Sequence, residues 1–180
     1  LGGVFSAQFG MSAIYGSRAG LSVGEISIMV SVIYAAALVL QYPIGWVSDR
    51  MDRRLLILIL AAIGGISAIV AVFFGTNFYV ILFSAAMMGG TSNPLYALLI
   101  AYANDYLERE DMAAASGGLL FINGVGAIAG PLIVGAALDS FGPPGYWVFI
   151  AVLMIGLAVY AGWRMTRRKS HAQVSDLVSY

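Results

Sequence analysis

The chain has 180 residues, of which 61% are hydrophobic and 10% are charged, and its formal net charge is zero. Soluble domains carry about 25% charged residues, so this composition excludes an ordinary soluble domain and indicates a membrane protein. The chain has no cysteine, which excludes disulfides and thiolate metal sites, and we expect no nucleic-acid partner.

Apolar runs separated by charged or turn-forming residues predict an all-α membrane protein with six membrane-spanning helices. The clearest run, residues 55–104, contains no Lys, Arg, Asp, Glu or His and is interrupted only by Gly75-Thr76-Asn77. In chain order the predicted spans cover about residues 1–16, 26–48, 55–74, 78–103, 112–138 and 146–162, giving a bundle over residues 1–163. Residues 164–180 are predicted to be a polar, cytoplasmic tail, disordered or weakly helical.

The first span is shorter than a full crossing, and no basic segment precedes its apolar residues. We therefore expect no signal peptide, and we expect the chain to be part of something longer.

The basic residues predict the orientation of the spans, since Lys and Arg gather in short cytoplasmic connectors. Only Arg18 lies on the outer side. The other side holds Arg50, Arg53, Arg54, Arg109, Arg164, Arg167, Arg168 and Lys169. We therefore expect an integral membrane protein, in a bacterial inner (plasma) membrane, with the tail and both charged connectors in the cytoplasm.

The connector after the second span has the most specific pattern, Gly45-Trp46-Val47-Ser48-Asp49-Arg50-Met51-Asp52-Arg53-Arg54. It resembles the major facilitator superfamily signature between the second and third helices of each six-helix half. That signature reads Gly, three residues, Asp, Arg or Lys, any residue, Gly and two basic residues. The matching positions are Gly45, Asp49, Arg50, Arg53 and Arg54. Asp52 stands where the family usually has Gly, although Asp accepts the left-handed conformation of a tight turn better than most residues.

The resemblance implies that these residues form a gating motif that helps to close the cytoplasmic side. On physical grounds, Gly45 would let a neighbouring helix approach closely. Asp49 would pair with a basic residue or with the positive end of a helix. The alternative is that the connector is merely a positive-inside loop.

A second pattern lies in the fifth span, where Gly126, Gly130, Pro131 and Gly135 resemble the same superfamily's Gly, three residues, Gly-Pro signature. Gly126 and Gly130 share a helix face and would permit close packing, and Pro131 would kink the helix. The alternative is plain helix packing. The order of the two patterns implies one half of a major facilitator fold. An uncharged fourth span and a polar tail favour the carboxy-terminal half, and residues 41–45, 92–96 and 104–105 are similar to the bacterial YcaD-like branch.

The resemblance implies that the first and fourth spans line a central transport pathway. In the first span Gln8, Ser12 and Tyr15 form a polar stripe, and in the fourth Asn93 and Tyr96 flank Pro94, which we expect to break the helix. The alternative is that these side chains hydrogen-bond to neighbouring helices.

Between their flanks the spans hold no carboxylate, histidine or cysteine. We therefore expect no enzyme activity, no metal, no cofactor and no proton relay within this chain. No phosphate-cradling motif indicates ATP-driven transport.

The leading hypothesis is a secondary active or facilitative transporter that moves a small, uncharged or amphipathic solute by alternating access. Its partners would be the lipid bilayer, the small-molecule substrate and a missing amino-terminal six-helix half. The alternatives are a half-size carrier that acts with a second copy as a homodimer, and a membrane scaffold or sensor that transports nothing.

Overall fold

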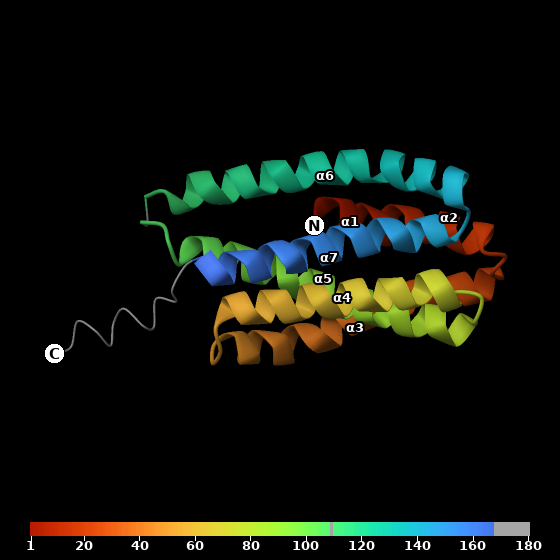
Figure 1. The fold of residues 1–180 in the computed structure, drawn as a ribbon, viewed down its shortest axis with the longest axis horizontal. Helices are drawn as coiled ribbons and strands as arrows, with labels where there is room; N and C mark the ends of the chain where they lie inside the picture. The colour runs from red at the N-terminus through yellow and green to blue at the C-terminus, as the bar shows by residue number, and fades with distance from the viewer. Residues whose placement is uncertain (109, 168–180) are drawn as a thin grey trace.

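The computed structural model describes residues 1–108 and 110–167, and these residues form six helical rods (Figure 1). The first rod is composite and consists of α1 (Gly2–Ser6), the π-helix η1 (Ala7–Met11) and α2 (Ser12–Arg18). It is followed by α3 (Val23–Ser48), α4 (Arg53–Phe74), α5 (Phe78–Asn104), α6 (Met112–Phe141) and α7 (Pro144–Arg167).

Successive rods run antiparallel along the long axis of the molecule (Figure 1). At one end α3, α5 and α7 finish and α4 and α6 begin, and we call this the basic end because Arg50, Arg53, Arg54, Arg164 and Arg167 lie there. Arg18 lies at the opposite end, where α2 finishes. Arg109 and the predicted tail beyond Arg167, with Arg168, Lys169 and His171, lie outside the described residues.

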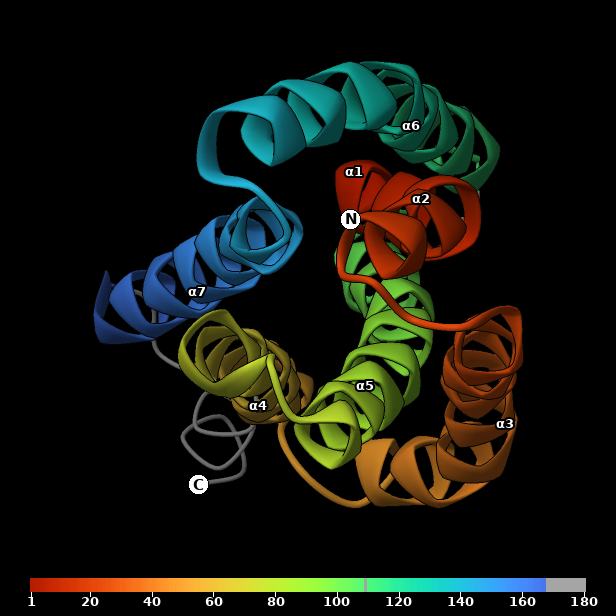
Figure 2. The ribbon, with the colours of Figure 1, turned by 90° about the vertical axis from the view of Figure 1, so that its right-hand side faces the viewer.

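The rods pack side by side and share one apolar core (Figure 2). α4 lies between α5 and α7, α3 packs on α5, and α6 packs on both α1 and α7. The core is apolar, and its largest fully buried side chains include Trp147, Tyr15, Tyr146 and Met29. Large apolar side chains also cover the outside, as Leu38, Phe73 and Phe121 are each more than 70% exposed.

Four of the described helices, α3, α4, α6 and α7, are long and apolar enough to cross a bilayer. α5 has 27 residues, but the sequence Gly-Gly-Thr-Ser-Asn-Pro at its centre lowers its mean hydropathy. Apolar side chains that face outward at full helix length are what a lipid solvent requires. The chain is therefore an all-helical membrane protein in its described part.

Side-chain caps explain where three of these helices begin. The Ser22 hydroxyl accepts a hydrogen bond from Glu25 N, and the Glu25 carboxylate accepts one from Ser22 N at 2.8 Å. Because of this cap, α3 begins at Val23, before the expected residue 26. Asp52 caps α4, and Asn77 caps α5 by accepting from Tyr79 N at 2.9 Å. α7 continues to Arg167, so residues 164–167 are helical although the predicted tail included them.

The prediction that Pro94 breaks its helix is wrong, because α5 continues through it. A proline removes one backbone donor, and two side chains that precede Pro94 bond to backbone carbonyls one turn earlier. Asn93 Nδ2 donates to the Gly89 carbonyl at 3.2 Å, and Thr91 Oγ1 donates to the Met87 carbonyl at 2.7 Å. α6 likewise continues through Pro131.

The contact between α3 and α5 depends on Gly89. A Cβ atom placed there would lie 2.2 Å from the Ile33 carbonyl oxygen, and this backbone atom cannot rotate away. We expect Gly89→Ala to lower the free energy of unfolding by about 1–3 kcal/mol, as overpacking does in a filled core. Thermal unfolding in one detergent measures the effect.

The matched control is Gly135→Ala in α6, where a Cβ would meet nothing within 4 Å. There, alanine should be neutral or stabilise the helix by up to about 1 kcal/mol, because glycine is a poor helix former. Equal loss of stability in both variants would contradict the proposed contact.

Candidate functional site

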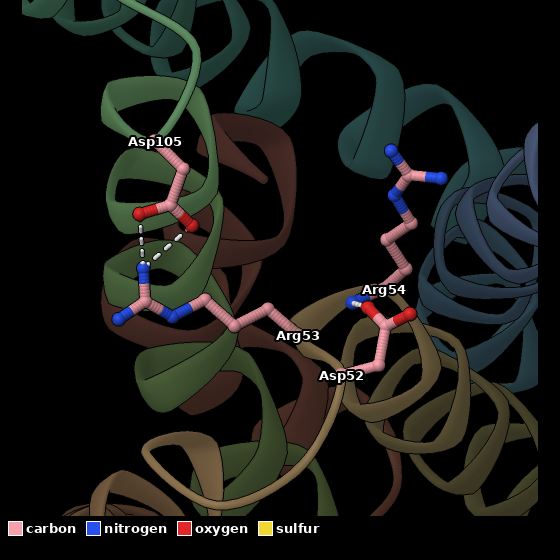
Figure 3. A network of polar contacts seen from close by, with 4 residues as sticks. All are labelled: Asp52, Arg53, Arg54 and Asp105. Carbon is pink, nitrogen blue, oxygen red and sulfur yellow. Dashed lines mark hydrogen bonds and ion pairs between the residues drawn. The ribbon is translucent and has the colours of Figure 1, made fainter. Parts of the chain in front are cut away.

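The predicted gating motif, residues 45–54, covers the end of α3, the tight connection after it and the start of α4, at the basic end. Ser48 ends α3, Asp49 is its C-cap, and Asp52 is the N-cap of α4. Asp52 has φ −59° and ψ 116°, and its Oδ1 accepts a hydrogen bond from Arg54 N at 2.9 Å (Figure 3). Asp52 therefore does not use the left-handed conformation that aspartate tolerates, and no non-glycine residue of the described part has a positive φ. Asp52 stands at the position of the family's glycine and caps α4.

Arg53 ties the motif to the end of α5. Its Nη1 lies 2.6 Å from Asp105 Oδ1 and 2.7 Å from Asp105 Oδ2 (Figure 3). The Arg53 side chain is 29% exposed and that of Asp105 is 48% exposed, so water screens the pair. The ion pair joins two helices across a sequence separation of 52 residues.

Arg54 extends to the other side of Asp52 (Figure 3) and donates a hydrogen bond to the Tyr106 hydroxyl. Its guanidinium carbon lies 5.6 Å from the ring centre of Tyr102 and 5.8 Å from that of Tyr106, within the range of cation–π attraction. Partial burial opposes ionisation of Tyr106, but hydrogen bonds from Tyr102 and Arg54 together with the Arg54 charge outweigh it. The pKa of Tyr106 is therefore lower than that of an ordinary tyrosine.

The other three positions that match the family signature, Gly45, Asp49 and Arg50, are exposed. Arg50 lies over the Trp46 ring at 3.9 Å and donates to the Trp46 carbonyl at 3.0 Å. Asp49 is exposed, and within residues 1–108 and 110–167 its carboxylate has no hydrogen-bond or ion-pair partner. A Cβ at Gly45 would meet nothing within 4 Å, so the close helix approach expected there does not occur among the described residues.

The predicted polar stripe of the first rod lies inside the bundle. Gln8, Ser12 and Tyr15 are each at most 3% exposed. Gln8 Nε2 donates to Ser92 Oγ at 2.7 Å, and Ser12 Oγ donates to the Gln8 carbonyl at 2.6 Å. The Tyr15 ring stacks on Tyr146 with 4.6 Å between ring centres. Gln8 thus makes the interhelical hydrogen bond that the alternative expects, whereas Ser12 bonds within its own rod. The role of the stripe in a pathway stays a prediction.

Asn93 and Tyr96 of α5 are partly exposed. The Tyr96 ring meets Phe5 edge-on at 5.6 Å. Tyr96 also lines an apolar cavity of about 400 Å³ between the first rod, α5, α6 and α7, together with Gly126 and Gly130. The fold thus brings Tyr96, predicted for the transport pathway, to the same cavity as Gly126 and Gly130, which were predicted for helix packing.

Two of the predicted packing glycines of α6, Gly126 and Gly130, lie against the first rod. A Cβ at Gly126 would lie 3.2 Å from Gly3 N, and one at Gly130 would lie 3.1 Å from Gly3 Cα and 1.9 Å from Ser6 Oγ. Gly135 faces open space. The small-residue face of α6 therefore contacts α1 through its first two glycines and ends before the third.

Sequence reasoning left out the partners of the predicted residues. These are Asp105 and Tyr106 for the arginines, Ser92 for Gln8, and Asp139, which pairs with Arg18 at 2.6 Å. The sequence offered one indication of the Asp105 partner, because Asp105 follows a predicted span that ends on the same side of the membrane as Arg53. Among the residues that the structure describes, no three His, Asp or Glu side chains gather as metal ligands.

Comparison with known proteins connects this geometry to a family. The family model described as Major Facilitator Superfamily matches residues 2–178. The uncharacterized MFS-type transporter YfkF of Bacillus subtilis (strain 168) is 26% identical over 163 residues, which are 87% of this chain and 40% of the relative. The uncharacterized MFS-type transporter YcaD of Escherichia coli (strain K12 / DH10B) is 25% identical over 151 residues, 82% of this chain and 38% of the relative.

The fold also resembles that in the crystal structure of an auto inhibited POT family peptide transporter, with a TM-score of 0.75 and 16% sequence identity. The likeness covers 94% of this chain and 36% of that one. The chain spans about two fifths of the length of the curated relatives it matches. The predicted resemblance to this superfamily, with a YcaD protein among the relatives, is confirmed.

The Arg53–Asp105 pair should make a small but measurable contribution to stability. We expect a double-mutant cycle of Arg53→Gln and Asp105→Asn to give a coupling energy of about 0.5–1 kcal/mol, because both side chains are partly exposed. Thermal unfolding in detergent at low salt measures it. Arg50→Gln combined with Asp105→Asn is the control and should be additive, since Arg50 contacts Trp46 instead. Zero coupling between Arg53 and Asp105 would contradict the pair.

Proposed function

This chain belongs to the major facilitator superfamily, and from that membership we propose that it forms one six-helix half of a secondary transporter. The transporter would move a small, uncharged or amphipathic solute by alternating access between two halves. Membership in a transporter family favours this function over an enzyme activity. The matched residues make up only 40% and 38% of the two relatives, so each relative is long enough to hold a second bundle of similar size.

The observation that carries the proposal is the state of the gating motif. Its Arg53 and Arg54 are held by α5 and by the start of the α5–α6 connector, whereas Asp49 and Gly45 are exposed side by side at the end of α3. A carboxylate at a helix end, next to a glycine with open space above it, suits a helix N-terminus or a basic side chain of another bundle. A gate between two halves needs such a contact, because it must form and break as the halves move.

The interior supports an uncharged or amphipathic solute. All buried polar side chains of the described residues are uncharged, namely Gln8, Ser12, Ser48, Ser67, Ser84, Thr91 and Ser92. A charged solute in a low-dielectric cavity needs an opposite charge or a dense set of dipoles. Coupling to protons would therefore depend on groups outside this part of the chain.

We further propose that the chain is the carboxy-terminal half, in a bacterial inner membrane, with its basic end in the cytoplasm. The other half would be six preceding helices, with a second copy of this chain as the alternative. The exposed apolar surface supports partners of this kind, because lipid and a second bundle both cover such a surface.

A flux assay of the intact protein tests the function. Proteoliposomes are loaded with a panel of uncharged, cationic and anionic compounds, with and without a proton gradient. Uptake of an uncharged or amphipathic compound is the expected result. Uptake of strongly charged compounds alone, or of none, would contradict the proposal.

Removal of the Asp49 charge should impair transport without impairing folding. We expect Asp49→Asn to lower flux about tenfold, equivalent to the ~1.4 kcal/mol that a carboxylate contributes at a partly buried helix end. Expression and the thermal unfolding temperature should stay unchanged. Asp111→Asn is the matched control, because Asp111 is also exposed at the basic end and makes no capping bond. Unchanged flux in Asp49→Asn would favour the scaffold or sensor alternative.

The orientation has a separate test, since the chain is free of cysteine and single cysteines can be added. Thr166 and Ser140 are both exposed and lie at opposite ends of the bundle. We expect a membrane-impermeant maleimide to label Ser140→Cys in intact cells, and Thr166→Cys only after the membrane is permeabilised. Labelling of both positions from the same side would overturn the predicted topology.

A further inference from the structure

Four aromatic side chains form a continuous row across three of the rods, and we call them the ring row. The row runs from Tyr96 of α5 to Phe5 of α1, then to Phe9 of η1 and finally to Tyr34 of α3. The ring centres of successive members lie 5.6, 5.9 and 5.2 Å apart. The first pair meets edge-on, and the other two pairs are tilted by 31° and 30°. Segments far apart in the sequence thus contribute to one line of rings.

The ring row is exposed at its α3 end. Phe9 is 46% exposed and Tyr34 is 51% exposed, whereas Phe5 and Tyr96 are partly buried. Tyr34 lies near the middle of α3, away from the headgroup level at which membrane tyrosines are enriched. The hydroxyls of Tyr34 and Tyr96 make no hydrogen bond to any residue in 1–108 or 110–167. Both hydroxyls are therefore available to a polar ligand or to water.

The face of α3 that carries Tyr34 does not have the character of a lipid-facing surface. Ser27, Ser31 and Tyr34 are all exposed and follow one another at i, i+4 and i+7, which places them on one helix face. The exposed residues of α4 between Leu55 and Phe74 are, by contrast, all apolar. Lipid requires the apolar pattern, whereas polar side chains at membrane depth face a cavity or another bundle. The ring row therefore opens toward a space other than lipid.

No charged side chain accompanies the ring row. α1, η1 and α5 contain no Lys, Arg, Asp, Glu or His, and the only such residue of α3 is Glu25, which belongs to the cap at the helix start. A cation bound by the rings would lack a counter-charge at this depth, and an anion would meet the negative faces of the rings. An uncharged ring, in contrast, can pack against them offset or edge-on.

The segment that carries Phe9 also carries a polar group with an unused acceptor. Gln8 is 1% exposed, and its Nε2 donates to Ser92 Oγ, but its Oε1 has no hydrogen-bond partner among the described residues. Ser92 precedes Tyr96 by one helical turn, so the carboxamide lies at the level of the ring row. A buried acceptor without a donor is costly, and an N–H or O–H group of a ligand would remove that cost. Gln8 and Phe9 both belong to η1, and π-helical turns are frequent at functional sites.

We propose that the ring row binds a small, uncharged aromatic solute that carries a hydrogen-bond donor. The ring of the solute packs against Phe9 and Tyr34, the two exposed members, and the Gln8 side chain turns so that its Oε1 accepts the donor. This inference rests on the proposed function, because it names the class of solute that the transporter carries.

Binding of 2-naphthol to the intact protein tests the proposal. This compound is planar, is uncharged at neutral pH and has one O–H donor. Decahydro-2-naphthol has the same carbon skeleton and the same donor but no aromatic ring. Equilibrium dialysis with equal detergent on both sides measures the two affinities. We expect 2-naphthol to bind about fivefold or more tightly than decahydro-2-naphthol. Equal affinities, or no binding of either compound, would overturn the site.

A double variant locates the site on the ring row. We expect Phe9→Leu/Tyr34→Leu to weaken 2-naphthol binding about tenfold, because each lost ring contact costs a several-fold loss of affinity. The matched control is Phe73→Leu/Tyr79→Leu, which removes the same two kinds of ring at positions that are 74% and 79% exposed and lie outside the row. We expect the control to change binding less than about twofold. Equal losses in the two double variants would contradict the assignment.

Two further comparisons keep the test decisive. 2-Methoxynaphthalene keeps the rings and lacks the donor, so Gln8→Met should weaken binding of 2-naphthol several-fold and leave that of 2-methoxynaphthalene unchanged. Equal effects on both compounds would overturn the role of Gln8. If the double variant fails to fold, Tyr34→Leu is compared with Tyr34→Phe, which keeps the ring and should bind 2-naphthol more tightly. Equal affinities of these two variants would overturn the ring contact.

The outcomes differ from those of the flux assay. Binding of 2-naphthol that depends on the ring row, without flux of any compound, would contradict the transporter and leave the aromatic site in place. Flux of uncharged compounds that Phe9→Leu/Tyr34→Leu leaves unchanged, together with 2-naphthol binding that this variant does not weaken, would overturn the site and leave the proposed function in place.

Discussion

Close contact between helix backbones is the interaction on which the rest of this structure depends. Lipid tails are as apolar as leucine, so helices in a bilayer gain little from hiding apolar side chains from one another and associate through tight packing. Glycine makes the tight packing possible here. At Gly89 the α5 backbone meets Ile33 of α3, and at Gly130 the α6 backbone meets Gly3 of α1. The outer surface can then stay apolar for lipid, while polar side chains pair inside.

The same constraint places the charges. Ionised groups are costly in the hydrocarbon region, so the arginines of the described residues lie at helix ends, and most lie at the basic end. At the basic end, two neighbouring arginines make two different sets of contacts. Arg53 bonds to Asp105 and ties the predicted gating motif to α5, while Arg54 turns to the rings of Tyr102 and Tyr106. Arg53 and Arg54 directly follow the Asp52 cap, and consecutive residues on a helix point about 100° apart, so the two side chains diverge.

Much of the fold was readable from the sequence, because membrane helices are encoded locally. Apolar runs mark the helices, whereas the cap of Ser22 with Glu25 places the start of α3 at Val23, ahead of the predicted residue 26. The gating motif was also readable, since its residues lie within ten consecutive positions. The contacts that the motif makes could be predicted only in part. A motif names Arg53 and Arg54 but not their partners, which lie 52 residues away at the end of another helix.

What the sequence by itself determined is the solvent, the helical spans, the basic end and the family. Each of these follows from composition or from spacing within one or two turns of helix. Only the tertiary structure decided that Gln8 bonds to Ser92, that Gly130 packs while Gly135 is open, and that α5 continues through Pro94. The physical reason is that these outcomes depend on how each helix is rotated and which helix stands beside it. Neighbouring backbones and side chains set that rotation, and no local pattern in the sequence contains it.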